Sequence, residues 1–132
     1  MRIVAVVLLF MLIYSCHSTV EPFKITRFKQ YPGGGLDRGG CNFIDQVSKA
    51  EIFITYDTCG YLSIDDSVVV LRSMPLRADS IEHYESGQFE VDVTTTLLSD
   101  SVYKNCDYSG VVTIKKKGGG SVTKKVFAVC GL

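Results

Sequence analysis

His83 is the residue of this chain best suited to acid–base chemistry. It lies among acidic side chains, with Asp79 and Glu82 before it and Glu85 after it, and nearby carboxylates favour the protonated form of a histidine. A catalytic histidine also needs a nucleophile, and the sequence has no G-x-S-x-G or similar nucleophile motif. We therefore interpret His83 as a loop histidine on an acidic surface and expect no catalysis.

Two groups of acids could hold a calcium ion, Asp65-Asp66 and the carboxylates around His83. A calcium loop has regularly spaced acids of the D-x-D-x-D-G type, which the chain lacks. Zinc is not expected either, because none of the cysteines forms a C-x-x-C pair. The sequence predicts no metal site and no cofactor, and loose acids of this kind are usually solvated.

Charge is distributed unevenly along the chain. Residues 57–107 contain ten acids and three basic residues, whereas residues 108–132 contain five lysines and no acid. The lysines are Lys115, Lys116, Lys117, Lys124 and Lys125. They could dock the protein on an anionic membrane surface, or they could simply protect an exposed hairpin from aggregation. Nucleic acid is not expected as a partner, since no aromatic residues are interleaved with these lysines.

The first residues read "MRIVAVVLLFMLIYSCHS" and have the pattern of a secretory signal peptide. Arg2 precedes an apolar stretch, and Cys16 and Ser18 are small residues at positions −3 and −1 of a cleavage site. A lipobox at Cys16 is less favoured, because Tyr14 is bulky. We expect residues 1–18 to be removed and residues 19–132 to form a single domain. Its compartment would be extracellular or the endolysosomal lumen.

The expected mature chain has four cysteines, and an even number in an exported protein predicts two disulfides and no free thiol. The glycines of residues 118–120 predict a hairpin loop, which would bring Cys130 near Cys106. This geometry favours Cys106–Cys130 together with Cys41–Cys59. The pairing of Cys59 with Cys130 and of Cys41 with Cys106 stays open.

Alternation of apolar and polar residues is the main structural pattern. It predicts an edge strand in residues 22–31 and further strands at 49–57, 67–76, 87–98, 110–117 and 121–130. No segment has a sustained helical repeat. Short strands separated by turn residues predict an all-β fold, an antiparallel β-sandwich of immunoglobulin-like architecture stabilised by disulfides.

Residues 56–93, "YDTCGYLSIDDSVVVLRSMPLRADSIEHYESGQFEVDV", resemble the ML (lipid-recognition) family, nearest its ganglioside-activator branch. Cys59 matches the leading cysteine of that family, Asp79 and Ile81 its connector, and Gly87 the start of its next strand. The segment "GVVTIKKKGGGSVTKKVFAVC" extends the resemblance to Cys130. The resemblance implies two splayed sheets with an apolar ligand between them and no chemistry.

The function expected on this basis is that of a secreted lipid-binding or lipid-transfer protein. Its cavity would be lined by apolar side chains of alternating strands: Phe53, Val69, Leu71, Met74, Ile81, Phe89, Val91, Val93, Leu97 and Phe127. The same side chains could instead fill a packed core. The alternative function is a secreted interaction module that binds protein or glycan. The sequence does not indicate the oligomeric state.

Overall fold

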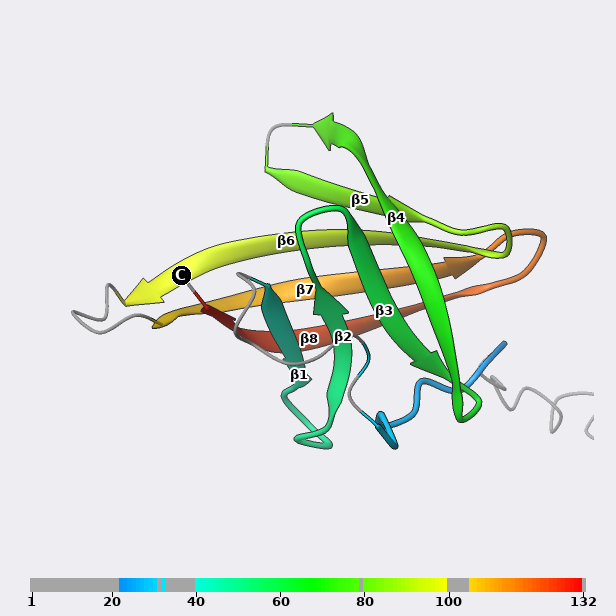
Figure 1. The fold of residues 1–132 in the computed structure, drawn as a ribbon, viewed down its shortest axis with the longest axis horizontal. Helices are drawn as coiled ribbons and strands as arrows, with labels where there is room; N and C mark the ends of the chain where they lie inside the picture. The colour runs from blue at the N-terminus through cyan, green and yellow to red at the C-terminus, as the bar shows by residue number, and fades with distance from the viewer. Residues whose placement is uncertain (1–21, 31, 33–39, 79, 100–104, 132) are drawn as a thin grey trace, which may run out of the picture.

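In the described part of the chain, eight strands close into an antiparallel barrel (Figure 1). The computed structural model describes residues 22–30, 32, 40–78, 80–99 and 105–131. The strands are β1 (Cys41–Asp45), β2 (Glu51–Thr55), β3 (Cys59–Ile64), β4 (Ser67–Ala78), β5 (Ile81–Glu85), β6 (Phe89–Ser99), β7 (Asn105–Lys116) and β8 (Ser121–Gly131). Each strand pairs with the next in the chain, and β8 pairs with β1. The expected signal peptide lies outside the described residues.

The sequence-based fold class is confirmed in its coarse form and differs from the structure in its architecture. The fold is all-β and antiparallel and contains a disulfide, as expected. The expected sandwich is replaced by a closed barrel, because β1 supplies a pairing partner for β8. The described residues contain no helix that is long and apolar enough to span a membrane.

Strand β5 forms where the sequence predicts a connector between two strands. It pairs with β4 on one side and with β6 on the other. Its side chains alternate normally, with Tyr84 in the core and His83 on the opposite face. Polar residues occur on both faces, so the strand lacks the apolar alternation by which strands are recognised.

The β3–β4 hairpin accounts for the Asp65-Asp66 pair. Both residues adopt positive φ angles, 48° and 65°, as a two-residue hairpin turn requires. Aspartate tolerates this conformation better than most residues. The Asp65 carboxylate also accepts a hydrogen bond of 3.2 Å from the backbone N–H of Lys24. These acids therefore have a structural role in the turn.

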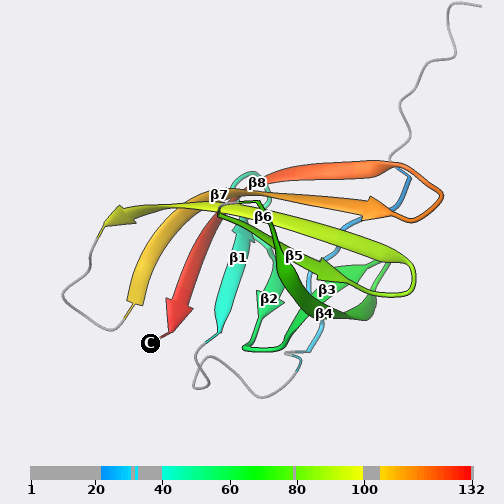
Figure 2. The same ribbon diagram turned by 90° about the horizontal axis from the view of Figure 1, so that it is seen from above.

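The segment before β1 closes one end of the barrel. The side chain of Phe23 is buried and meets the ring of Phe89 edge to face, with 5.4 Å between the ring centroids. The expected edge strand in residues 22–31 is reduced to one bridge between Ile25 and Ile64. Figure 2 shows β7 and β8 running side by side to the hairpin, where Gly120 lies against Pro22.

The disulfide joins Cys41 and Cys130, so both predicted pairings are wrong. Strands β1, β8 and β7 place Cys41, Cys130 and Cys106 in one row across the sheet. Cys130 therefore has a cysteine opposite it on each side, which sequence spacing could not resolve. Cys59 is a free thiol on β3, which contradicts the expectation that the mature chain has none.

Candidate functional site

A hollow of about 150 Å³ opens at the end of the barrel opposite Phe23. It lies beside the disulfide, and β1, β5, β6, β7 and β8 contribute to its wall. The lining residues are Cys41, Phe43, Glu82, Thr95, Tyr108, Ala128 and Cys130. We call this hollow the barrel mouth.

Register between neighbouring strands creates the barrel mouth. Leu97, Tyr108, Ala128 and Phe43 are successive partners across β6, β7, β8 and β1. In this row the small Ala128 lies between two aromatic residues. An alanine flanked by large side chains leaves unfilled space, which explains why the mouth is hollow at this level.

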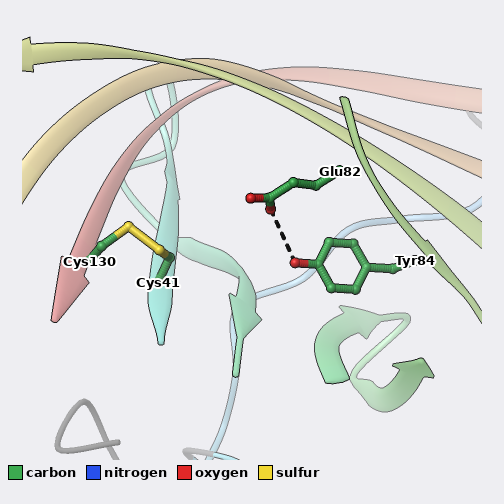
Figure 3. Close-up of a disulfide and its surroundings, with 4 residues drawn as sticks. All are labelled: Cys41, Glu82, Tyr84 and Cys130. Atoms are coloured by element: carbon green, nitrogen blue, oxygen red, sulfur yellow. Dashed lines mark hydrogen bonds between the residues drawn. A yellow bond between two sulfur atoms is a disulfide. The ribbon is translucent and has the colours of Figure 1, made fainter. Parts of the chain in front are cut away.

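Glu82 is the charged residue of the barrel mouth. It shares the inner face of β5 with Tyr84, whose hydroxyl donates a 3.1 Å hydrogen bond to Oε2 of Glu82 (Figure 3). Burial raises the pKa of Tyr84 well above its usual range, and the negative charge of Glu82 raises it further. Tyr84 therefore remains a neutral donor at physiological pH and fixes the orientation of this carboxylate.

The groups in the barrel mouth are suited to binding. The walls are aromatic and aliphatic, and Glu82 and Thr95 supply acceptors at the rim. Among the described side chains, the lining holds a phenol, a hydroxyl and a carboxylate, and no histidine or lysine. Binding sites for small molecules typically combine such apolar walls with a few polar groups.

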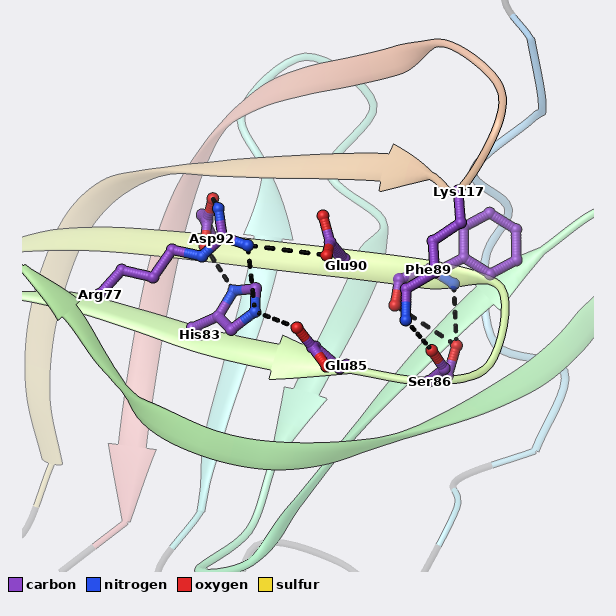
Figure 4. Close-up of polar contacts among 8 residues, drawn as sticks. All are labelled: Arg77, His83, Glu85, Ser86, Phe89, Glu90, Asp92 and Lys117. Atoms are coloured by element: carbon purple, nitrogen blue, oxygen red, sulfur yellow. Dashed lines mark hydrogen bonds and ion pairs between the residues drawn. The ribbon is translucent and has the colours of Figure 1, made fainter.

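His83 lies on the outer face of β5, and it is buried rather than loop-exposed. Its Nε2 lies 2.9 Å from Oε1 of Glu85 (Figure 4). The hydrogen bond from His83 lowers the pKa of Glu85, although burial opposes this. Of the other two acids expected near His83, Glu82 lies on the opposite face and Asp79 lies outside the described residues.

Three charged residues around His83 were not expected from sequence: Arg77, Glu90 and Asp92. Asp92 is the direct cross-strand partner of His83, and Glu90 that of Glu85. Alternation in residues 88–93 places Glu90 and Asp92 on one face. Only the assignment of β5 as a strand could have brought that face to His83.

The residues expected to line a cavity divide between the two faces of the wall. Phe53, Leu71, Phe89, Val91 and Val93 are buried in the barrel core, and Val69 packs against it. Leu97 faces inward near the mouth and is 45% exposed.

Three of the expected cavity residues lie elsewhere, and their assignment is corrected. Met74 is the cross-strand partner of His83, and Ile81 precedes His83 by two residues on β5. Both therefore lie on the outer face with His83. Phe127 alternates with the buried Val126 and Ala128 and is 40% exposed on the outer face of β8. Its ring lies 5.8 Å from the Lys49 ammonium.

The five lysines do not form one uniform patch. Lys117 donates a 2.9 Å hydrogen bond to the carbonyl of Ser86, and Lys124 is half-buried and contributes to the lowered pKa of Asp45. Lys115, Lys116 and Lys125 are exposed. Three of the five thus remain available to meet an anionic surface.

Comparisons with protein-family models, with curated proteins and with solved structures find no match to this chain. The resemblance of residues 56–130 to the ML family therefore stays a prediction. The two splayed sheets that it implies are replaced here by a closed barrel.

Proposed function

We propose that this protein binds a small, mainly apolar ligand in the barrel mouth and performs no chemistry. The observation that carries the proposal is the hollow itself, whose lining combines the core residues Phe43 and Ala128 with the polar side chains of Glu82 and Thr95. Eight-stranded barrels are just wide enough to be filled by side chains or to hold one small ligand. Here the closed end is filled and the mouth is not.

The volume of the mouth restricts the lipid-class ligand expected from sequence. A hollow of about 150 Å³ corresponds to roughly five water molecules at liquid density. It suits a small aromatic molecule or the end of an acyl chain, with the remainder of the ligand outside the barrel. The Glu82 carboxylate at the rim would favour a neutral or cationic polar end over an anionic one.

We propose that the protein acts as a carrier outside the cell. The Cys41–Cys130 disulfide is consistent with an oxidising, extracellular compartment. Delivery from a membrane would use the exposed Lys115, Lys116 and Lys125, each of which is worth about 1 kcal/mol near an anionic surface. Co-sedimentation with anionic vesicles that weakens at high salt would support docking through these lysines. If the protein does not co-sediment even at low salt, this docking does not occur.

The mouth can be tested by blocking it from one strand. Thr95 lines the mouth, whereas its neighbour Thr96 lies on the outer face. We expect a neutral fluorescent probe, N-phenyl-1-naphthylamine, to bind the wild type saturably and to be excluded by Thr95→Trp. Thr96→Trp is the matched control and should bind normally. Equal binding by both variants, or no saturable binding by the wild type, would contradict the proposal.

An interaction module is the second candidate, because one half of β4 is paired on one side only. Ser67–Leu71 pair with β3, but the pairing with β5 begins at Arg72. Val68 and Val70 are 49% and 58% exposed there. A strand with a free side can accept an extended peptide of a partner protein. Native mass spectrometry of protein from a secretory host separates the two candidate functions. A retained small molecule would favour ligand binding in the barrel mouth. A bound protein partner that is lost in the Val68→Pro variant would favour peptide binding at β4.

A further inference from the structure

The outer face of β5 and β6 holds a buried histidine in a fixed orientation. His83 is only 5% exposed, and its Nδ1 lies 2.7 Å from Oδ1 of Asp92. The other ring nitrogen, Nε2, faces Glu85. Histidines that bind metals characteristically have one ring nitrogen held by a carboxylate, which sets the ring orientation and leaves the other nitrogen for the ion.

Two glutamates face each other beside this nitrogen. Glu85 and Glu90 are direct partners across the β5–β6 pair, and like charges placed directly opposite destabilise a sheet. Ligand atoms of His83, Glu85 and Glu90 all lie within 4.8 Å of one another. Bonds of about 2.0–2.2 Å to a shared ion would therefore require only small side-chain rotations.

Arg77 places a positive charge in direct contact with the cluster. Its guanidinium lies 3.6 Å from Glu90, 3.7 Å from Asp92 and 3.4 Å from Nε2 of His83. The side chain is 48% exposed, so it can leave the cluster without passing through the core. Lys115 is the partner of Glu90 on β7, and the charge of Lys117 acts on Glu85, so lysines also contribute positive charge here. A divalent ion would place two charges at the centre of the carboxylates, where the guanidinium places one.

We propose that His83 Nε2, Glu85 and Glu90 form a binding site for a divalent transition-metal ion, with Asp92 as the positioning residue and Arg77 displaced on binding. One imidazole nitrogen and two carboxylate oxygens are a ligand set for zinc-like ions, whereas calcium and magnesium prefer oxygen alone. Three protein ligands leave a fourth position for water. This site lies on the outside of the wall and is independent of the barrel mouth.

An ion at this position would join β5 to β6. His83 and Glu85 belong to β5 and Glu90 to β6, so the ion would cross-link two strands that contribute residues to the barrel mouth. A ligand that binds only the folded chain raises its melting temperature, and the rise increases with affinity and with ligand concentration. Metal binding therefore has a readout that needs no activity.

The experiment titrates the metal-free mature protein with Zn²⁺ by calorimetry and with Co²⁺ by visible absorption at neutral pH. A Cys59→Ser background removes the thiol of Cys59, which is free in the described part of the chain, as a competing ligand. We expect one Zn²⁺ ion to bind per chain and to raise the melting temperature. We expect Mg²⁺ neither to bind nor to change the melting temperature. Stoichiometric binding that vanishes in the Cys59→Ser background would overturn the proposal.

Four variants test the geometry. Glu90→Gln should weaken Zn²⁺ binding at least tenfold, and Asp92→Asn roughly ten- to hundredfold. Arg77→Gln should tighten it, because the competing cation is gone. Asp57→Asn, at an exposed acid between β2 and β3, is the control and should leave affinity unchanged. If Arg77→Gln weakens binding, or if Glu90→Gln leaves it unchanged, the assignment is wrong.

Discussion

Strand β6 runs from the closed end of the barrel to the mouth, so the two ends can be compared along one strand. Its inward side chains run from the closed end to the mouth in the order Phe89, Val91, Val93, Thr95 and Leu97. The first three are 4%, 0% and 1% exposed, whereas Thr95 is exposed and Leu97 is 45% exposed. The same alternation therefore fills a core at one end and lines an opening at the other.

The difference shows what stabilises each end. At the closed end, Phe23 completes a core in which aromatic and aliphatic side chains meet from nearly every strand. At the mouth the interior is incompletely filled, and a covalent bond between β1 and β8 ties the wall together. Packing thus stabilises one end, and chain connectivity stabilises the other.

The largest effect is expected from a charge placed at the closed end. Val91→Asp would bury an unpaired carboxylate and should destabilise the fold by about 5 kcal/mol or more. Thr95→Asp makes a similar change on the same face of the same strand, and it should cost about 1 kcal/mol or less because water reaches it. Urea unfolding at neutral pH measures both. Equal losses would show that the two ends are filled alike.

The disulfide should account for the next largest effect. It closes a loop with a sequence separation of 89 residues, and removing such a cross-link costs about 4 kcal/mol by relaxing the unfolded chain. Cys41→Ala with Cys130→Ala should show this loss, together with faster hydrogen exchange in β1 and β8 near the mouth. Cys59→Ala, which removes a free thiol, is the control. Comparable losses in both proteins would place the stabilising bond elsewhere.

The aromatic plug should have a smaller effect. Phe23 is 5% exposed, and its replacement by alanine should cost about 3 kcal/mol through lost burial and the cavity left behind. Phe127 is 40% exposed on the outer face, so Phe127→Ala should cost clearly less. Thermal unfolding compares the two. A larger effect at Phe127 would mean that the outer face of β8 is packed more tightly than the closed end.

The closed end is also the part of the fold that the sequence predicts best. Val91 and Val93 alternate cleanly with charged residues, so their strand and its inner face follow from the sequence. The glycines of residues 118–120 likewise place the β7–β8 hairpin correctly. In contrast, β5 is polar on both faces, and β1 is a short strand after a glycine-rich segment. Neither has the alternation that would identify it.

The mouth and the His83 cluster could not be predicted from the sequence, because both depend on the pairing of distant strands. Phe43 meets Ala128 only when β1 closes the barrel against β8. His83 meets Asp92 only when the supposed connector is a strand in register with β6. Sequence spacing indicates which face a side chain occupies, but not which residue lies opposite it in the next strand.

The smallest effect is expected for the tyrosine hydroxyl between the two ends. Tyr84→Phe keeps the buried ring and removes the hydrogen bond to Glu82, which should cost about 1 kcal/mol at neutral pH. Because the folded chain raises the pKa of Tyr84 above the value of about 10 in the unfolded chain, this residue's contribution is fully present below pH 10. It is lost as the pH rises further.

Urea unfolding at pH 7 and pH 11 measures this contribution. The wild type should lose more stability than Tyr84→Phe between the two pH values, since the two proteins differ only at this hydroxyl. Glu82→Gln should reduce the difference, because the carboxylate charge is a secondary cause of the raised pKa. If the wild type and Tyr84→Phe lose stability equally, Tyr84 titrates normally. Solvent would then reach deeper into the barrel than the buried ring implies. The boundary between the packed end and the mouth would lie closer to the closed end than Tyr84 does.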